Sequence, residues 1–350
     1  MQKEFTDISK IGEFGLINKI SETVKLYHPD SEKGIGDDAA ILNFNGSKIL
    51  VTTDMLTEGV HFDLTYMPLQ HLGYKAVAIN LSDIYAMNGE PRQITVSIGL
   101  SSRFSVEHIE EIYKGINKAC EFYKVDIVGG DTVSSLSGLI ISITAIGVAN
   151  EKEITMRSGA QENDLICVSG DLGAAYLGLK LLAREKAAFE VAPHQQPQFD
   201  GYEYLIERQL KPEPRRDICN KLREAGIIPT SMIDISDGLS SELMHLAQNS
   251  EVGCRIYDEK LPIHQQSIRL CEEFNIDPSI PALNGGEDYE LLFTIKQSDY
   301  EHIAKIENVS VIGHITSYKG LCEIVFRDGT AVPLTAHGWN AFVNDDETDM

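Results

Sequence analysis

Two hydrophobic periods alternate along this chain, one of two residues and one of about 3.6 residues. The first is typical of strands and the second of amphipathic helices. In the first half the pattern predicts strands at Lys48–Thr53, Ile94–Leu100, Asp126–Val128 and Leu139–Val148, and helices over Leu69–Met87 and Val106–Tyr123. In the second half it predicts strands at Leu165–Ser169, Met232–Ile235, Gly253–Tyr257, Tyr289–Ile295 and Val309–Ile315, and a helix over Leu172–Arg184. Alternation of both kinds of element indicates a mixed α/β fold.

A polar stretch near the middle of the chain separates these elements into two groups. Residues Asn150–Glu153 are polar and charged, and the strand pattern resumes after them. A chain of 350 residues is long enough for two domains. We therefore expect one domain over residues 1–150 and a second over residues 151–350. The segment Ala187–Pro214 is rich in Pro, Gln and Glu, which favours a surface insertion with a short helix at Tyr202–Gln209.

The composition is that of an acidic globular protein. The chain has 30 Lys and Arg against 53 Asp and Glu, a formal net charge of −23, and 43% of its residues are hydrophobic. This acid excess argues against nucleic acid and anionic membrane surfaces as partners. No run of about 18 apolar residues predicts a membrane-spanning helix, and the N-terminus does not resemble a signal peptide. The six cysteines form no C-x-x-C pair, so we expect free thiols in a cytoplasmic protein.

The predicted helix Leu69–Met87 carries a carboxylate that should be buried. Asp83 shares one helical face with Leu72, Ala76 and Ile79. The opposite side of the helix is also apolar, so we expect this helix to be covered on both sides. A buried carboxylate requires a cation or hydrogen-bond donors. The sequence therefore predicts a functional role for Asp83.

Further acids lie at the ends of predicted strands and in glycine turns. Asp54 and Asp131 each follow an apolar strand, where α/β proteins collect ligands. Other acids lie in GIGDDAA (Gly34–Ala40) and DISD (Asp234–Asp237). If these carboxylates converge, their repulsion favours bound divalent cations, and oxygen ligands without a His/Cys cluster indicate Mg²⁺. Such ions would attract phosphate to an otherwise acidic protein.

Glycine turns supply a second signal for phosphate. GIGDD, GGD and SGDLG permit close backbone approach, although ordinary tight turns use the same residues. The sequence contains neither G-x-x-x-x-G-K-[ST] nor G-x-G-x-x-G. A nucleotide site, if present, must therefore be of another kind.

Several motifs, taken in order, resemble the thiamine-monophosphate kinase family. They are GIGDDAAIL, VTTDMLTEGVHF, GYKAVAINLSDIYAMNGEP, IVGGDT, RSGAQENDLICVSGDLG, DISDGLSSEL and GGEDYELLF, with HGWNAF at the end. The wider superfamily contains aminoimidazole ribonucleotide synthetase and selenophosphate synthetase. The resemblance implies a two-domain fold of that type, in which a ferredoxin-like N-terminal α/β domain forms a barrel of strands across a homodimer and a C-terminal α/β domain completes the active site.

The resemblance also implies an activity and a set of site residues. The activity is direct, in-line transfer of the ATP γ-phosphate to thiamine monophosphate, with several Mg²⁺ ions, and Asp54, Asp83, Asp131 and Asp234 are expected to be catalytic. The residues expected to hold metal are Asp38, Thr52, Thr53, Asp54, Asp83, Asp131, Asp234 and Asp237. Those expected at the nucleotide are Tyr113, Gly130, Asp131, Arg157 and Ser236, and those at thiamine are His61, Glu287 and Trp339.

The chemistry of single residues leaves alternatives open. Arg157 can form a bidentate fork to phosphate or a surface ion pair. Trp339, the only tryptophan, can stack on a cationic heteroaromatic ring or pack in a core. Glu287 can be a turn acid, and His61 can cap or pack. Two other functions compete: an ATP-dependent enzyme of the same superfamily with a different acceptor, such as a ribonucleotide or selenophosphate synthetase, and a non-catalytic cation-binding protein, for which no EF-hand motif is present.

Overall fold

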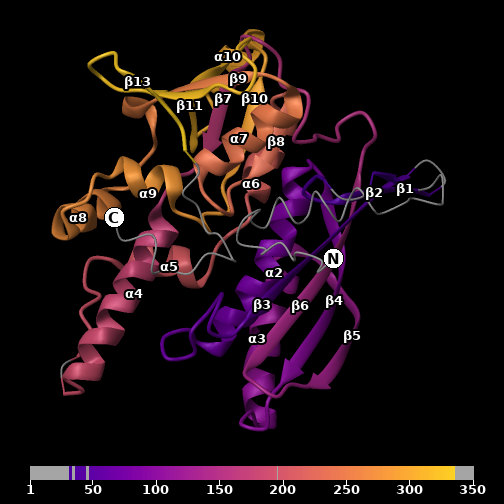
Figure 1. Ribbon diagram of the computed structural model, residues 1–350. Helices are drawn as coiled ribbons and strands as arrows, with labels where there is room; N and C mark the ends of the chain where they lie inside the picture. The colour runs from indigo at the N-terminus through magenta and orange to yellow at the C-terminus, as the bar shows by residue number, and fades with distance from the viewer. Residues whose placement is uncertain (1–30, 34–35, 45–46, 195, 336–350) are drawn as a thin grey trace, which may run out of the picture.

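The computed structural model describes residues 31–33, 36–44, 47–194 and 196–335, and these form two β-sheets with helices packed against them (Figure 1). The predicted mixed α/β class is confirmed. Within the described residues, none of the helices combines the length and apolarity needed to cross a membrane.

The first sheet is built from the first half of the chain. Its strands are β1 (Ser31–Lys33), β2 (Ala40–Phe44), β3 (Ser47–Thr57), β4 (Glu90–Leu100), β5 (Asp126–Ser134) and β6 (Leu139–Ala149). They lie in the order β1-β2-β3-β6-β4-β5, and neighbours are antiparallel except β4 and β5. The parallel pair is joined by α3 (Val106–Tyr123), as a parallel connection requires a crossover.

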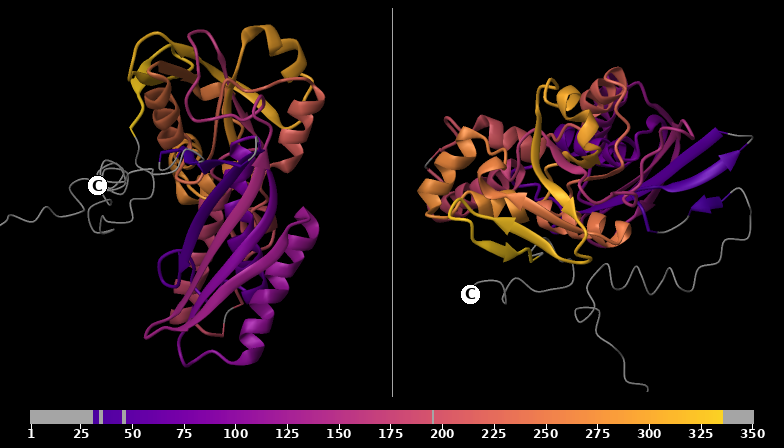
Figure 2. Two further views of the ribbon diagram at one scale, coloured as in Figure 1. Left: turned by 90° about the vertical axis from the view of Figure 1, so that its right-hand side faces the viewer. Right: turned by 90° about the horizontal axis from the view of Figure 1, so that it is seen from above.

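One face of this sheet is covered by helix α2 (Leu69–Ala86), beside which α3 packs (Figures 1 and 2). Alternate residues of β6, among them Leu139, Ile141 and Ile143, are fully buried against this layer. Burying each such side chain stabilises the fold by about 1.5–3 kcal/mol. The period-two pattern of the sequence therefore identifies the face of the sheet that α2 covers.

Helices α2 and α3 approach each other backbone to backbone. A Cβ atom on Gly115 would lie 1.9 Å from the carbonyl oxygen of Gln70, and one on Gly73 would lie 2.0 Å from that of Ile112. Glycine is therefore required at both crossing points, because any side chain would push the helices apart. This contact fixes the position of α2 relative to the crossover.

The second sheet is built from the second half of the chain. Its strands are β7 (Leu165–Ser169), β8 (Ser231–Asp234), β9 (Gly253–Tyr257), β10 (Leu291–Ile295), β11 (Val309–Thr316), β12 (Cys322–Val325) and β13 (Ala331–Pro333), in the order β13-β12-β9-β11-β7-β10-β8. Only β9 and β12 are parallel among these neighbours. The last strand of the first sheet ends at Ala149, and the first strand of the second sheet begins at Leu165. This division is compatible with a domain boundary near residue 150, and the boundary itself stays a prediction.

The remaining helices belong to the second half of the chain. They are α4 (Ala174–Val191), α5 (Glu203–Leu210), α6 (Arg216–Glu224), α7 (Leu239–Ser250), α8 (Gln265–Phe274), α9 (Ser279–Asn284) and α10 (Tyr300–Ile303). Helix α4 extends past the predicted end at Arg184, because the residues that follow include good helix formers. It projects away from the second sheet (Figure 1), and the predicted short helix in the 187–214 segment is α5.

Helix α2 lies between the two sheets. It packs against β3, β6 and β4 on one side and against β8 and α5 on the other. One continuous hydrophobic core contains Leu81 and Ile84 of α2, Ile218 of α6, and Met232 and Phe293 of the second sheet. The expectation that this helix is covered on both sides is confirmed, and its polar residues are consequently enclosed by both halves of the chain.

Candidate functional site

Three carboxylates from distant parts of the sequence meet where α2 contacts β8. Asp38 precedes β2, Asp83 lies on α2, and Asp234 ends β8. Each offers one oxygen atom, and these atoms all lie within 4.8 Å of one another. Asp38 and Asp234 are buried and Asp83 is half-buried. We call these three residues the carboxylate cluster.

Hydroxyl groups fix the orientation of two of these carboxylates. Thr52 Oγ1 on β3 donates to Asp83 Oδ2 at 2.6 Å, and Ser82 Oγ donates to Asp234 Oδ2 at 2.6 Å. The second bond joins α2 to the end of β8, so it also ties the two halves of the chain together. Ser82 was not predicted, although a hydroxyl next to a carboxylate in an apolar helix is a signal that could have found it.

Arg157 forms a bidentate fork to the third carboxylate. Its Nε and Nη2 atoms donate to the two Asp38 oxygens at 3.1 Å and 2.7 Å. In this structure the fork is therefore an ion pair with a carboxylate, and of the two alternatives that the sequence leaves open this is the one seen, in a mostly buried place. A role for Arg157 at a nucleotide phosphate stays a prediction, and it requires the guanidinium to share its donors or to change partner.

Asp54 lies beside the carboxylate cluster on β3. Its backbone N–H donates to Asn80 Oδ1 at 3.0 Å, and Asn80 Nδ2 donates back to the Ala76 carbonyl at 3.0 Å. This pair of bonds fixes the strand against α2. The Asp54 carboxylate is close enough to raise the pKa values of Asp83 and Asp234.

Burial raises the pKa values of all four acids. Desolvation raises the pKa of Asp38 to about 7, in spite of Arg157, and raises those of Asp54 and Asp234 to about 6. For Asp83, desolvation and then repulsion from Asp54, Asp234 and Asp38 hold the pKa well above its usual range. The site is thus short of positive charge when its acids are ionised.

This arrangement fits the magnesium that the family resemblance implies. The convergent donors are carboxylate oxygens with hydroxyls behind them, and no His or Cys belongs to the carboxylate cluster. Hard oxygen ligands of this kind suit Mg²⁺ and not zinc. Asp38, Asp83 and Asp234, with Asp54 beside them, would hold the ion, which when bound neutralises charge on phosphate oxygens.

Three other predicted metal ligands lie outside the carboxylate cluster. Thr53 is on the opposite face of β3 from Thr52, and its hydroxyl donates to the Ile143 carbonyl at 3.0 Å, so only its own carbonyl could serve. Asp131 is exposed on edge strand β5, where Oδ1 accepts from the Thr132 N–H at 2.8 Å. The Asp237 N–H donates to Glu242 at 3.0 Å. Metal ligation by these three residues stays a prediction.

The predicted nucleotide residues are spread around the carboxylate cluster. Tyr113 is half-buried on α3, and Gly130 is on β5, where a Cβ atom would lie 1.9 Å from the Val96 carbonyl oxygen. The Ser236 carbonyl accepts from the Glu287 N–H at 2.7 Å. These positions leave their nucleotide contacts as predictions.

Two of the predicted thiamine residues lie within the described residues. His61 is exposed in the turn after β3, and its Nδ1 accepts from the Thr57 N–H at 3.1 Å. Glu287 has a left-handed backbone, with φ of 65°, in the loop before β10. Trp339 lies outside the described residues. A Cβ atom on Gly286 would lie 2.6 Å from the Ser236 carbonyl oxygen, so glycine at this position lets the loop pack against the segment that follows β8.

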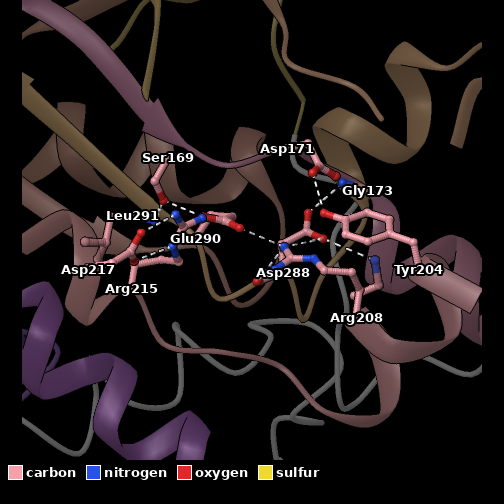
Figure 3. Close-up of polar contacts among 11 residues, drawn as sticks. Ser169, Asp171, Gly173, Tyr204, Arg208, Arg215, Asp217, Asp288, Glu290 and Leu291 are labelled. Carbon is pink, nitrogen blue, oxygen red and sulfur yellow. Dashed lines mark hydrogen bonds and ion pairs between the residues drawn. The ribbon is translucent and has the colours of Figure 1, made fainter. Parts of the chain in front are cut away.

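A second charged cluster anchors the loop before β10 through Asp288 and Glu290 (Figure 3). Glu290 Oε2 accepts from Arg215 Nη1 at 2.6 Å and from Ser169 Oγ, and Glu290 Oε1 lies 3.0 Å from Arg208 Nη2. Asp288 accepts from the N–H groups of Gly173 and Ala175, at 2.6 Å and 3.2 Å, at the start of α4. The sequence does not predict that Arg208 and Arg215 pair with Glu290, because both arginines lie far from the GGEDYELLF motif in the sequence.

Helix α2 contributes two further polar residues that the sequence analysis missed, Asn80 and Lys75. Asn80 bonds to the Asp54 backbone as described above. Lys75 is 1% exposed, and its Nζ lies 2.9 Å from Glu287 Oε1. A lysine in an otherwise apolar helix usually reaches the surface, so its sequence context gave little indication of this contact.

The first test concerns the charge of the carboxylate cluster. In metal-free protein at pH 8, Asp83→Asn should raise the free energy of unfolding by at least about 1 kcal/mol, because it removes a carboxylate whose folded pKa is raised. The sign follows from the binding of the proton. A carboxyl group with a higher pKa in the folded state stabilises the fold at low pH, where it is protonated, and this stabilisation is lost as the pH rises through the folded pKa. Urea unfolding in EDTA measures this effect.

The same acids should give the wild type a characteristic response to pH and Mg²⁺. Stability without metal should fall between about pH 4 and 7, because Asp54 and Asp234 keep their protons up to about pH 6 in the folded state and Asp38 up to about pH 7, whereas in the unfolded chain all three ionise near the usual pKa of an Asp. Mg²⁺ should stabilise the wild type more at pH 8 than at pH 6 and should leave Asp83→Asn unchanged. A less stable variant that still responds to Mg²⁺ would contradict the assignment.

The second test concerns Glu290. Glu290→Gln should destabilise the fold by about 3 kcal/mol, because it removes the buried charge that bridges Arg208 and Arg215 and leaves Arg208 with only a more distant carboxylate, that of Asp288 at 3.8 Å. Denaturant unfolding measures the loss, with Glu301→Gln on exposed α10 as a control that should change stability by less than about 0.5 kcal/mol. Equal stability of the two variants would show that this cluster is not a structural anchor.

Curated thiamine-monophosphate kinases match this chain over nearly its whole length. The chain is 36% identical to that of Aquifex aeolicus (strain VF5), covering 96% of this chain and 99% of the relative. It is 34% identical to that of Bacillus subtilis (strain 168), covering 94% and 99%. Residues 36–149 match the family described as AIR synthase related protein, N-terminal domain.

A solved structure gives the same result in three dimensions. AaThiL complexed with AMPPCP and TMP superposes with a TM-score of 0.82 at 34% identity, covering 96% of this chain and 99% of that one. Sequence and fold therefore agree over nearly the whole chain. The protein belongs to the thiamine-monophosphate kinase family.

Proposed function

We propose that this protein transfers the γ-phosphate of ATP to thiamine monophosphate in a Mg²⁺-dependent reaction, giving thiamine diphosphate and ADP. The observation that carries the proposal is the convergence of Asp38, Asp83 and Asp234 in a chain of this family. The relative AaThiL is complexed with AMPPCP, an ATP analogue, and TMP, which supports both substrates.

The residues of the chain act by holding groups in place. The acceptor is a phosphate oxygen that is already ionised, so the transfer does not require a strong general base. Positioning and charge neutralisation are the main demands. Asp38, Asp54, Asp83 and Asp234 would hold the metal. Arg157, at the edge of the same site, would orient a phosphate by sharing with it the donors that now bond to Asp38.

The finer assignments are part of the same proposal. Thr52 supports Asp83 through its hydroxyl hydrogen bond, and Thr53, Asp131 and Asp237 would complete the set for further Mg²⁺ ions. Tyr113, Gly130, Asp131 and Ser236 would contact the nucleotide together with Arg157. His61, Glu287 and Trp339 would contact thiamine, and Glu287 is supported by its contact with the loop that follows Asp234.

An assay of ADP release with Mg²⁺ and a panel of phosphate acceptors tests the activity. Thiamine monophosphate should be turned over, and Asp54→Asn should reduce turnover by at least about 100-fold, because removal of one charged transition-state group costs this much. Asp200→Asn, at an exposed position, is the matched control and should keep wild-type activity.

The assay also decides between the competing functions. Turnover of a different acceptor in place of thiamine monophosphate would support another enzyme of the superfamily. Wild-type turnover by a folded Asp54→Asn protein would overturn the role of Asp54. Circular dichroism of each variant establishes that it is folded.

We further propose a homodimer formed through the strands of the first sheet. Every residue of edge strand β5 is exposed in the single chain, including Val128 at 58% and Val133 at 55%. Exposed apolar edge strands pair readily with another strand and are usually covered. Pairing of two copies through the first sheet would cover this edge and bring Asp131 into a protected environment.

Sedimentation equilibrium tests the dimer. The wild type should sediment at twice the mass of one chain at micromolar concentration, and Val133→Lys should weaken the association at least about tenfold, because it places a charge in an apolar interface. Glu110→Lys on the exposed side of α3 should leave the association unchanged. A monomeric wild type would contradict the proposal.

A further inference from the structure

Lys75 is a fully buried cation whose partners come from the other half of the chain. It lies on α2 with 1% of its surface exposed. Its Nζ lies 2.9 Å from Glu287 Oε1 and donates to the Gln209 carbonyl at 3.1 Å. A buried ammonium is tolerated only with partners of this kind, so the position of Glu287 and the burial of Lys75 depend on each other.

Glu287 is held by three separate contacts. Its Oε1 meets Lys75, its Oε2 accepts from Gln209 Nε2 at 2.7 Å, and its backbone N–H donates to the Ser236 carbonyl at 2.7 Å. Its side chain nevertheless keeps 26% of its surface exposed. Each carboxylate oxygen can accept more than one hydrogen bond. Glu287 is therefore a fixed acceptor that remains open on one side.

The same helix carries both Lys75 and Asp83. They are eight residues apart, which places them on one face and about 12 Å apart along the axis. Because α2 is enclosed by both sheets and pressed against α3 at Gly73, this spacing is rigid. Through Lys75, the helix sets how far Glu287 lies from the carboxylate cluster.

We propose that Lys75 is a positioning residue for the acceptor substrate. Its ammonium fixes the Glu287 carboxylate where it accepts a hydrogen bond from the amino group of an aminopyrimidine ring, at a set distance from the phosphate end of the same substrate. Lys75 itself touches neither substrate. The inference rests on the proposed function, since it assigns a partner to the thiamine side of that site.

Steady-state kinetics of Lys75→Met tests the inference. Methionine keeps the volume of the lysine stem and removes the charge. KM for thiamine monophosphate should rise at least tenfold, while KM for ATP stays within twofold and kcat within threefold, because only the acceptor loses a positioned contact. Lys180→Met, at an exposed position of α4, is the matched control and should leave all three constants unchanged.

A double-mutant cycle separates positioning from a general structural role. Because Lys75 acts through Glu287, Lys75→Met should change KM for thiamine monophosphate less than twofold when it is added to Glu287→Gln. Multiplicative effects of the two substitutions would overturn the proposal. The proposal would also be overturned if folded Lys75→Met kept the wild-type KM for thiamine monophosphate. It would be overturned as well if the only effect were a fall in kcat in proportion to the fraction of protein that is folded.

A second variant covers the case in which Lys75→Met does not fold. Gln209→Met removes the other side-chain donor to Glu287 and keeps the backbone carbonyl that Lys75 uses. The side-chain oxygen of Gln209 has no hydrogen-bond partner in the structure, so the substitution strands no buried donor. It should raise KM for thiamine monophosphate at least threefold with KM for ATP unchanged. If the variant and the wild type had the same KM for thiamine monophosphate, fixing Glu287 would not matter for the acceptor, and the proposal would be overturned.

The two proposals fail in different ways in this experiment. The proposed function fails if the wild type does not turn over thiamine monophosphate. The positioning role fails if the wild type does so and the ratio of variant to wild-type KM remains near one.

Discussion

The structure depends on the burial of a helix that carries polar side chains. Helix α2 is enclosed by the first sheet, α3, and the elements of the second half, and an unsatisfied polar group at such a place is costly. Asn80 and Asp83 find their partners on β3, and Ser82 finds its partner at the end of β8. These hydrogen bonds bring β3 and the end of β8 to the same part of α2. The contacts that pack the core therefore also assemble the site.

The carboxylates of the site repel one another, and the packing of the core offsets this repulsion. Four acids with raised pKa values lie close together, and Arg157 is the cation bonded directly to one of them. Their repulsion is tolerated because apolar contacts between the helices and both sheets offset it. The same repulsion makes the site selective for a cation, since a bound divalent ion relieves a cost that the folded chain already bears.

Local pattern was sufficient to predict much of the fold. Strands β7 and β9 and helix α3 have the predicted bounds, because their periodicity is strong and their ends are marked by turn residues. Asp83 was predicted to be functional from helix geometry alone, and the structure places it in the carboxylate cluster. Helices α6 to α10 and the strands β1, β2, β12 and β13 were not predicted, and α4 was predicted too short.

The contacts that complete the site could not be read from local pattern. The meeting of Asp38 with Asp234 is set by how two sheets pack on α2, which no window of sequence contains. The same holds for Arg208 and Arg215, whose partner Glu290 lies far along the chain. Lys75 was missed because a lysine in an apolar helix usually extends its ammonium to the surface, whereas here its partner Glu287 comes from the second half of the chain.

The continuous core also limits how such a protein can change over evolutionary time. Because Leu81 and Ile84 share one core with Met232 and Phe293, the apolar surface of either half is complete only in the presence of the other. Neither half is therefore a portable module that recombination could join to an unrelated partner. The two halves are instead expected to be inherited together, with substitutions at their shared core compensated from both sides.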